Sequence, residues 1–190
     1  MENYTQEQVD EICTQHEAWL KDWHTGRRAD FSGANLRGLS LEGRILKEAN
    51  FKNADLTGAF LRSADFSHAN FEGANLTFVR ASYAKFNDCM ADHACFEEAR
   101  LTGAYFKGAS LQRASFRDAT VNFASFAEAN LWRADFIDAV TGGVIFARPE
   151  VKEEVRKILN LANRAASVKV FGLVQEYRNG QYVTAKEKAE

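Results

Sequence analysis

The chain has 190 residues, of which 46% are hydrophobic and 26% charged, and its formal net charge is -2. This length and composition suit one folded domain and exclude a largely disordered chain. The near-neutral charge argues against a protein that holds nucleic acid directly through a strong positive field, and no apolar run is long enough for a membrane span.

A helix within residues 5–24 is the first element that the sequence predicts. Thr5 and Gln8 form a capping-box pattern at its start, and we expect Gly26 to stop it. Apolar and aromatic residues recur at helical spacing and form one stripe: Val9, Ile12, His16, Trp19, Leu20 and Trp23. We expect this stripe, with both tryptophans, to cover the start of the domain that follows; a partner-binding helix is the alternative.

A period of five residues then runs through most of the chain. From Phe31 to Phe146 every fifth residue is Phe or Leu in 20 of 24 cases, and two residues earlier the column is Ala in 19 of 24 cases. This period fits neither a helix nor a strand. It predicts a coil that turns a corner every five residues, with one large and one small apolar side chain per repeat pointing inward. Successive turns should stack through backbone hydrogen bonds about 4.8 Å apart.

Three stretches carry this repeat in its most regular form: ADFSGANLRG, ANFKNADLTG and ADFSHANFEGANL. On these residues the sequence resembles the pentapeptide-repeat family, over residues 29–148. The resemblance implies an all-β solenoid, a right-handed quadrilateral β-helix with four repeats per coil and about six coils. We therefore divide the chain into an N-terminal capping helix (1–28), a repeat β-helix (29–148) and a C-terminal cap or dimerisation segment (149–190).

The residues after the repeat predict a different kind of structure. Pro149 suits the first turn of a helix, which we expect at about 150–165. For residues 167–185 a hairpin around Asn179-Gly180 is favoured, and continuation of the helix, with Gly180 as its C-cap, is the alternative. The apolar content of 150–185 exceeds what one end of a coil needs, and it predicts a homodimer through this segment.

The sequence predicts no enzyme. It contains no GxGxxG, P-loop, HExxH or GxSxG motif, so no catalytic, cofactor-binding or metal-binding residue is proposed. Cys89 stands in an alanine column and should be buried and inert, whereas Cys95 stands outside it. Three cysteines without a disulfide pattern, and an N-terminus unlike a signal peptide, indicate a reduced cytoplasmic setting.

Two outer faces of the predicted coil carry candidate binding residues. The face built on Leu36 to Phe136 is acidic, and its candidates are Glu98, Asp118, Asp135 and Asp138. The face built on Leu41 to Thr141 places rings beside arginines, and its candidates are Arg80, Arg100, Tyr83 and Phe123. Arginine and aromatic residues are typical of interface hot spots; the alternative is that these rings only shield the neighbouring backbone.

Two functions compete on these observations. The favoured one is a non-enzymatic binding scaffold that presents rigid faces to a protein partner. The alternative, implied by the resemblance, is a DNA-mimicking protein that binds or protects a type II topoisomerase, DNA gyrase, through its acidic face. A net charge of only -2 and repeats without an interrupting loop argue against this alternative.

Overall fold

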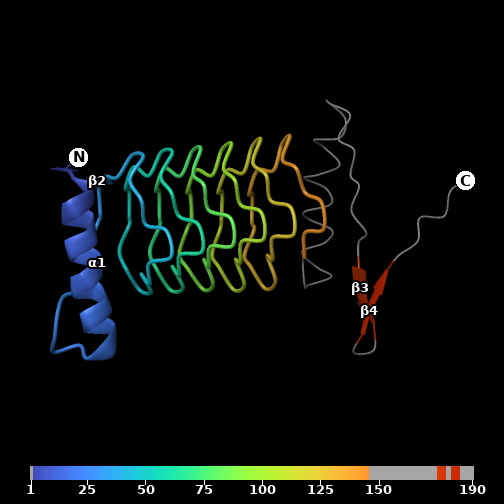
Figure 1. Cartoon of the computed structure of the whole chain (residues 1–190). Helices are drawn as coiled ribbons and strands as arrows, with labels where there is room; N and C mark the ends of the chain where they lie inside the picture. The colour runs from blue at the N-terminus through green and yellow to red at the C-terminus, as the bar shows by residue number, and fades with distance from the viewer. Residues whose placement is uncertain (1, 146–174, 179–180, 185–190) are drawn as a thin grey trace, which may run out of the picture.

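The computed structural model describes residues 2–145, 175–178 and 181–184. A rod of stacked coils makes up most of the molecule, and a helix lies across its N-terminal end (Figure 1). The elements in chain order are β1 (Glu2–Asn3), α1 (Gln6–Lys21), β2 (Ala34–Asn35), β3 (Gln175–Arg178) and β4 (Gln181–Thr184).

The rod is a four-sided β-helix. Parallel bridges join residues twenty apart, from Asp30–Asn50 to Ser125–Ile145, so four five-residue repeats complete one coil. Backbone hydrogen bonds join the layers. In one of them the Phe31 N–H donates to the Asn50 carbonyl oxygen at 2.7 Å. We number the layers in steps of twenty residues, so that layer 1 is 29–48 and layer 6 begins at residue 129.

Each corner of the coil has the same backbone conformation. Every fifth residue from Gly33 to Gly143 has a positive φ, between 53° and 69°. At the first corner Ala34 N–H donates to the Phe31 carbonyl at 3.0 Å, as in a type II turn, whose third residue needs a positive φ. The sequence analysis missed this column, although recurrent glycine and the absence of β-branched residues signal it.

Large and small apolar side chains fill the interior as predicted. Phe86 and Phe106 are fully buried, and their rings stack at 4.9 Å with planes 7° apart. Phe96 meets Phe106 edge-on, at 5.7 Å and 90°, so each ring has both stacked and perpendicular neighbours. Cys89 is buried as expected, and burial raises the pKa of its thiol, which keeps it protonated and unreactive.

Helix α1 packs on layer 1 through a stripe that differs in part from the predicted one. Thr5 and Gln8 form the capping box, and Val9, Cys13 and His16 are the buried residues of the helix. The prediction for Trp23 was wrong: it follows the end of α1 and is 70% exposed.

The end of the helix also differs from the prediction. The helix ends at Lys21, before the expected stop at Gly26, because Asp22 is already extended. Gly26, with φ of 68°, instead packs on the helix, where a Cβ would overlap the carbonyl oxygen of Gln15. Gly26 therefore lets the chain return closely along α1 rather than ending the helix.

Polar groups near the N-terminus take the place of a missing layer before layer 1. Strand β1 pairs in parallel with β2. The Gln6 side chain donates from Nε2 to the Ser40 carbonyl and accepts the Ser40 N–H at Oε1, both at 2.9 Å. Its amide thus binds the strand edge as a neighbouring peptide group would.

His16 supplies two further contacts to this edge. Its Nδ1 accepts the Ala29 N–H at 3.0 Å, and its Nε2 lies 2.9 Å from the Lys47 carbonyl. Because an atom that accepts an N–H carries no proton, the buried ring must be neutral, with its proton on Nε2. Burial lowers the pKa of His16, although the bond to Lys47 opposes the shift.

The C-terminal region is described only in part. Strands β3 and β4 pair antiparallel, with Gln175 opposite Thr184 and Arg178 opposite Gln181, so the two strands of the favoured hairpin are present at 175–178 and 181–184. The helix predicted at 150–165, and most of the segment predicted to dimerise, lie outside the described residues.

Candidate functional site

Three of the four candidate carboxylates form an exposed column. Glu98, Asp118 and Asp138 occupy the corner with positive φ in layers 4, 5 and 6, and all three are exposed. Within the described part of the chain they form no ion pair. Stacked like charges one layer apart repel each other, so this column is suited to an opposite charge from outside.

Asp135 does not belong to this column. Its carboxylate accepts a hydrogen bond from Arg117 at 3.0 Å and another from Ile137 N–H at 2.9 Å. The same pairing joins Arg37 to Asp55 in the first layers. Burial raises the pKa of Asp55, but hydrogen bonds from Thr57 and Arg37 outweigh burial and hold the pKa below its usual value.

A shallow groove of about 580 Å³ lies on the neighbouring side of the rod. Its lining includes Glu42, Phe60, Arg62, Arg80, Tyr83 and Arg100. The Arg80 guanidinium lies over the Phe60 ring, 5.0 Å from its centroid, and Arg80 pairs with Arg100 in the next layer. Three of the four candidates on this face, Arg80, Arg100 and Tyr83, are thus brought together in one groove.

The arginines of the groove have no acidic partner within the part of the chain that the structure describes. None of Arg62, Arg80 and Arg100 lies within ion-pair distance of a carboxylate among the described residues, and all three are exposed. An arginine held against a ring keeps its outer N–H donors free. The groove can therefore bind carboxylates of a partner without first breaking an ion pair.

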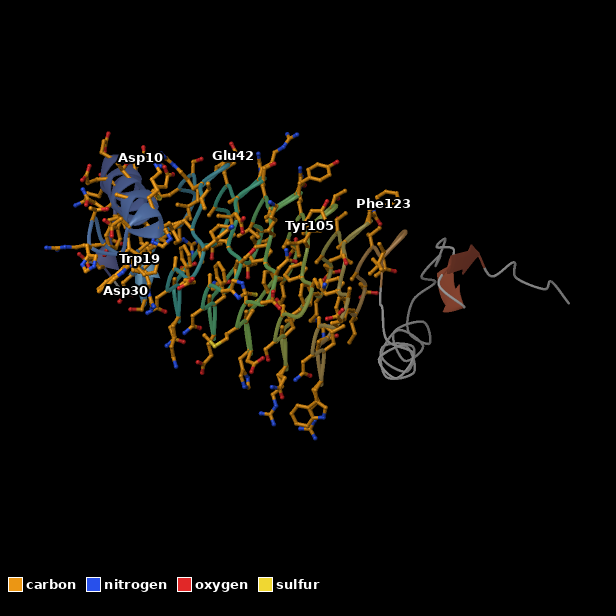
Figure 2. All side chains as sticks on the ribbon, turned by 90° about the horizontal axis from the view of Figure 1, so that it is seen from below. Asp10, Trp19, Asp30, Glu42, Tyr105 and Phe123 are labelled. Carbon is orange, nitrogen blue, oxygen red and sulfur yellow. The ribbon has the colours of Figure 1, made fainter. Side chains whose placement is uncertain are left out.

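The rings of this face cover glycines as well as meeting solvent. A Cβ on Gly103 would lie 2.7 Å from Tyr83, and one on Gly143 would lie 2.6 Å from Phe123. Each ring thus shields backbone in the next layer, as the alternative interpretation proposed, yet Tyr83 stays 51% and Phe123 70% exposed. Phe123 lies outside the groove and projects from the same side of the rod as Glu42 (Figure 2).

The two candidate sets meet on one continuous surface. Glu98 precedes Arg100 by two residues, so the acidic corner borders the arginine column directly. We call the side of the rod between the Glu98 corner and the Tyr83 corner, in layers 3 to 6, the mixed-charge face. Along it the arginines stand in layers 3 and 4 and the unpaired carboxylates in layers 4 to 6.

One further exposed cluster was missed by the sequence analysis. Two guanidinium groups lie over the Trp132 ring, with Arg113 at 5.2 Å and Arg133 at 4.5 Å from its centroid, and the ring is 41% exposed. The twenty-residue spacing of the two arginines is the signal that could have revealed it.

We searched the described residues for a metal site and for a membrane-spanning helix. No three His, Cys, Asp or Glu side chains converge there in a way that could hold a metal ion. No helix among the described residues is long and apolar enough to cross a bilayer.

A comparison of the sequence with family models identifies the family of this chain. The family model for pentapeptide repeats matches the chain at residues 27–62, 45–77, 61–90, 94–133 and 114–140. The chain belongs to the pentapeptide repeat family. Its four-sided coil is the right-handed quadrilateral β-helix of pentapeptide repeat proteins. Among curated proteins, none matches it in sequence.

Solved pentapeptide repeat proteins share the likeness at low identity. Rfr23 from the cyanobacterium Cyanothece 51142 is 20% identical over 70% of this chain and 98% of its own, with a TM-score of 0.36. A trypsin-treated form of QnrB1, a plasmid-mediated fluoroquinolone resistance protein, is 19% identical over 68% and 83%, also with a TM-score of 0.36. A protein from the Arabidopsis thaliana thylakoid lumen is 24% identical over 81% and 80%, with a TM-score of 0.24.

Proposed function

We propose that this pentapeptide repeat protein is a non-enzymatic scaffold that binds a protein partner through its mixed-charge face. The observation that supports this most is the groove in which Arg80 and Arg100 lie beside the rings of Phe60 and Tyr83, without an acidic partner in the described residues. Arginine and aromatic side chains supply much of the binding energy of protein interfaces. The hydrogen-bonded coil fixes the backbone that carries them, so little backbone entropy is lost on binding.

The test is whether proteins retained from the source cells depend on this face. The immobilised full-length chain should retain a partner that the double variant Arg80→Ala/Arg100→Ala loses. Lys52→Ala/Lys107→Ala removes the same charge elsewhere on the rod and should retain it. Equal retention by the wild type and both variants would show that the partner binds elsewhere.

The second candidate function is mimicry of DNA, supported by the exposed column of Glu98, Asp118 and Asp138. These carboxylates recur about 4.8 Å apart, a spacing roughly comparable to that of phosphates along DNA. If they act in this way, replacing all three with amides should abolish protection of DNA gyrase from its poisons, whereas Asp135→Asn, at a paired residue, should change little.

We rank mimicry second because the net charge is only -2 and Arg117 neutralises one acidic position. We therefore expect no strong effect on gyrase supercoiling or cleavage. Clear protection at micromolar protein would reverse the ranking.

Dimerisation through 150–185 also stays a prediction. Its support is the apolar content of the segment: Val155, Ile158, Leu159, Phe171 and Leu173. Sedimentation of the full chain and of a truncation after Arg148 tests it, because only the full chain should dimerise. A monomeric full-length protein would contradict it.

A further inference from the structure

Two neighbouring corner columns of the rod carry side chains of opposite charge in the same three layers. The acidic edge is the column of Glu98, Asp118 and Asp138 described above. The basic edge lies five residues earlier in each layer, one side of the coil away, and consists of His93, Arg113 and Arg133. All six side chains are exposed, and within the described ranges none of them forms an ion pair. We call the face between these two edges, built on Leu36 to Phe136, the dipolar face.

The side chains between the two edges are short or are bound to neighbours on the same face. Cys95 and Ser115 are small and only partly exposed. The Ser115 hydroxyl donates to Glu97 at 2.9 Å, and Arg117 pairs with Asp135 at 3.0 Å. The charges in the middle of the face are thus largely compensated within the chain, whereas those at its edges are not.

The Trp132 ring supports the basic edge. The guanidinium groups of Arg113 and Arg133 lie over this ring, at 5.2 Å and 4.5 Å from its centroid. Because a ring covers only one side of a planar guanidinium, the N–H donors at its rim stay available to carboxylates. The two arginines are one layer apart, about 4.8 Å, and therefore suit a partner whose carboxylates have the same spacing.

We propose that the dipolar face binds the same face of a second copy of this chain, with the two rods side by side and parallel. The two-fold axis runs along the rods, above the midline of the face. A half-turn about this axis keeps every layer at its own height and exchanges the two edges. The basic edge of each copy therefore meets the acidic edge of the other, layer by layer: His93 with Glu98, Arg113 with Asp118, and Arg133 with Asp138.

The heights of these residues permit such contacts. Five residues of the coil climb a quarter of a layer, about 1.2 Å, so paired side chains are almost level. The imidazole of His93 can donate an N–H to Glu98, and the arginines can form ion pairs with the aspartates. The inference goes beyond the proposed function, because it uses another face of the rod and leaves the groove of Arg80 and Arg100 open on both copies.

An exposed ring in layer 3 fits the same arrangement. Phe78 stands in the corner column of the acidic edge and is 50% exposed. The corresponding corner of the basic edge is Gly73, which has no side chain and lies against the Asn53 side chain. In the parallel pair each Phe78 ring lies over Gly73 of the other copy. Two rings are thereby partly removed from water, which adds apolar contact to the charge pairs.

Other pairings of two rods lack this match. A two-fold axis across the rods would make them antiparallel and would leave each edge opposite itself, so like charges would meet and repel. The adjoining face shares the basic edge, but its other corner carries Asp88, Gly108 and Glu128, and Glu128 already pairs with Lys107. The mixed-charge face shares the acidic edge, but its other corner carries no charge in layers 4 to 6. Only the dipolar face offers opposite charges in all three layers.

The repeat also favours a second copy over an unrelated protein, because a second copy presents the opposite charges with the same spacing. The two-fold axis produces each charge pair twice and closes the assembly as a dimer. Exposed ion pairs contribute little individually, and the contact is only one side of the coil wide. We therefore expect a dissociation constant of about 10–100 μM.

The test is charge reversal within one layer of the full-length chain, followed by sedimentation velocity at low salt. Arg113→Glu places like charges opposite each other twice per dimer, and so does Asp118→Arg. Each variant alone should dimerise at least about tenfold more weakly than the wild type. An equimolar mixture of the two should recover the wild-type affinity, because layer 5 then joins opposite charges again. A mixture of Arg113→Glu with Asp138→Arg should not recover it, because the changed residues lie in different layers.

The substitutions use side chains that these corners already accept. Glu98 and Arg133 adopt φ of 55° and 58° in the same corner conformation, and circular dichroism of each variant should match the wild type. Lys52→Glu reverses a charge outside the dipolar face and should leave dimerisation unchanged. Recovery in the matched mixture shows independently that both variants are folded.

Three outcomes would overturn the inference. The first is a wild-type chain that stays monomeric at about 500 μM, well above the expected constant. The second is self-association that Arg113→Glu does not weaken, which would support the C-terminal segment instead. The third is equal recovery in both mixtures, since charge without register would then be sufficient. Retention of another protein through Arg80 and Arg100 is measured separately, so the proposed function can stand or fall independently.

Discussion

The middle layers of the rod and its N-terminal end are stabilised in different ways. In the middle, each layer meets a copy of its own geometry, so backbone bonds repeat every twenty residues and Phe106 packs on Phe86 above and Phe126 below. At the end, layer 1 meets a helix, whose backbone cannot continue the ladder. The short strand β1 pairs with one part of this edge, at β2, and the Gln6 and His16 side chains bind other parts of it.

This difference follows from the open edge of a solenoid. An unpaired strand edge exposes N–H and C=O groups that another chain could bind, and a buried edge needs each of them satisfied. In stacked layers the backbone of the next layer binds these groups, whatever the side chains are, as long as the repeat is kept. An end requires particular residues at particular positions, so the interior should tolerate polar changes outside the two apolar columns, while the cap should be sensitive to a few.

The largest effect is expected inside the rod. Phe106 is fully buried between four other rings, so Phe106→Ala should lower the free energy of unfolding by about 3–5 kcal/mol through an unfilled cavity. Denaturant unfolding measures it. Phe78→Ala, at a half-exposed corner, is the matched control and should cost less than about 1 kcal/mol. Equal midpoints for the two variants would contradict the assignment of the interior.

The second effect tests the edge at the N-terminus. Gln6→Ala removes both partners of the Ser40 backbone, and we expect a loss of about 1–3 kcal/mol because part-buried polar groups lose their hydrogen bonds. Gln15→Ala is the control on the same helix, since the Gln15 side chain bonds to Glu11 one turn away. Faster amide exchange at Ser40 in Gln6→Ala alone would support this role. Unchanged exchange would mean that another group covers the edge.

The difference between the repeated interior and the N-terminal end also explains which features could be predicted from the sequence. The interior follows from two columns because burial depends only on period, and a repeat shows its period without any structure. The contacts of Gln6 and His16 depend on the angle at which α1 crosses layer 1, which no periodicity encodes. Trp23 was misplaced for the same reason, because helical spacing alone did not show that the helix ends at Lys21.

The candidate faces show a related limit. The sequence analysis compared residues twenty apart, which share a column, and so grouped Asp135 with the acidic positions. Side chains also pair at a spacing of eighteen, as Arg117 does with Asp135 and Thr57 with Asn75, because the residue after the large apolar one lies beside the residue before it in the next layer. Knowledge of this spacing would have removed Asp135 from the candidates.

The third prediction concerns pH at the cap. Burial lowers the pKa of His16 in the folded protein, so below about pH 6.5 the unfolded chain binds a proton that the folded chain resists. Stability should therefore fall as pH drops from about 7 to 5, since a protonated Nδ1 would oppose the Ala29 N–H. His16→Gln should reduce this slope in denaturant unfolding, and His24→Gln should not. Equal slopes in all three proteins would exclude His16 as the cause.

The smallest effect tests whether a positive φ costs energy where the corner residue is not glycine. His68 adopts a φ of 62°, and residues other than glycine adopt this backbone conformation only at some energetic cost. His68→Gly relieves that cost but loosens the unfolded chain, so we expect a gain of less than about 1 kcal/mol in the free energy of unfolding. Ala127→Gly, one position before a corner and without positive φ, should lose about 0.5–1 kcal/mol instead. Changes of the same sign in thermal or denaturant unfolding would show that the corner conformation carries no strain of its own.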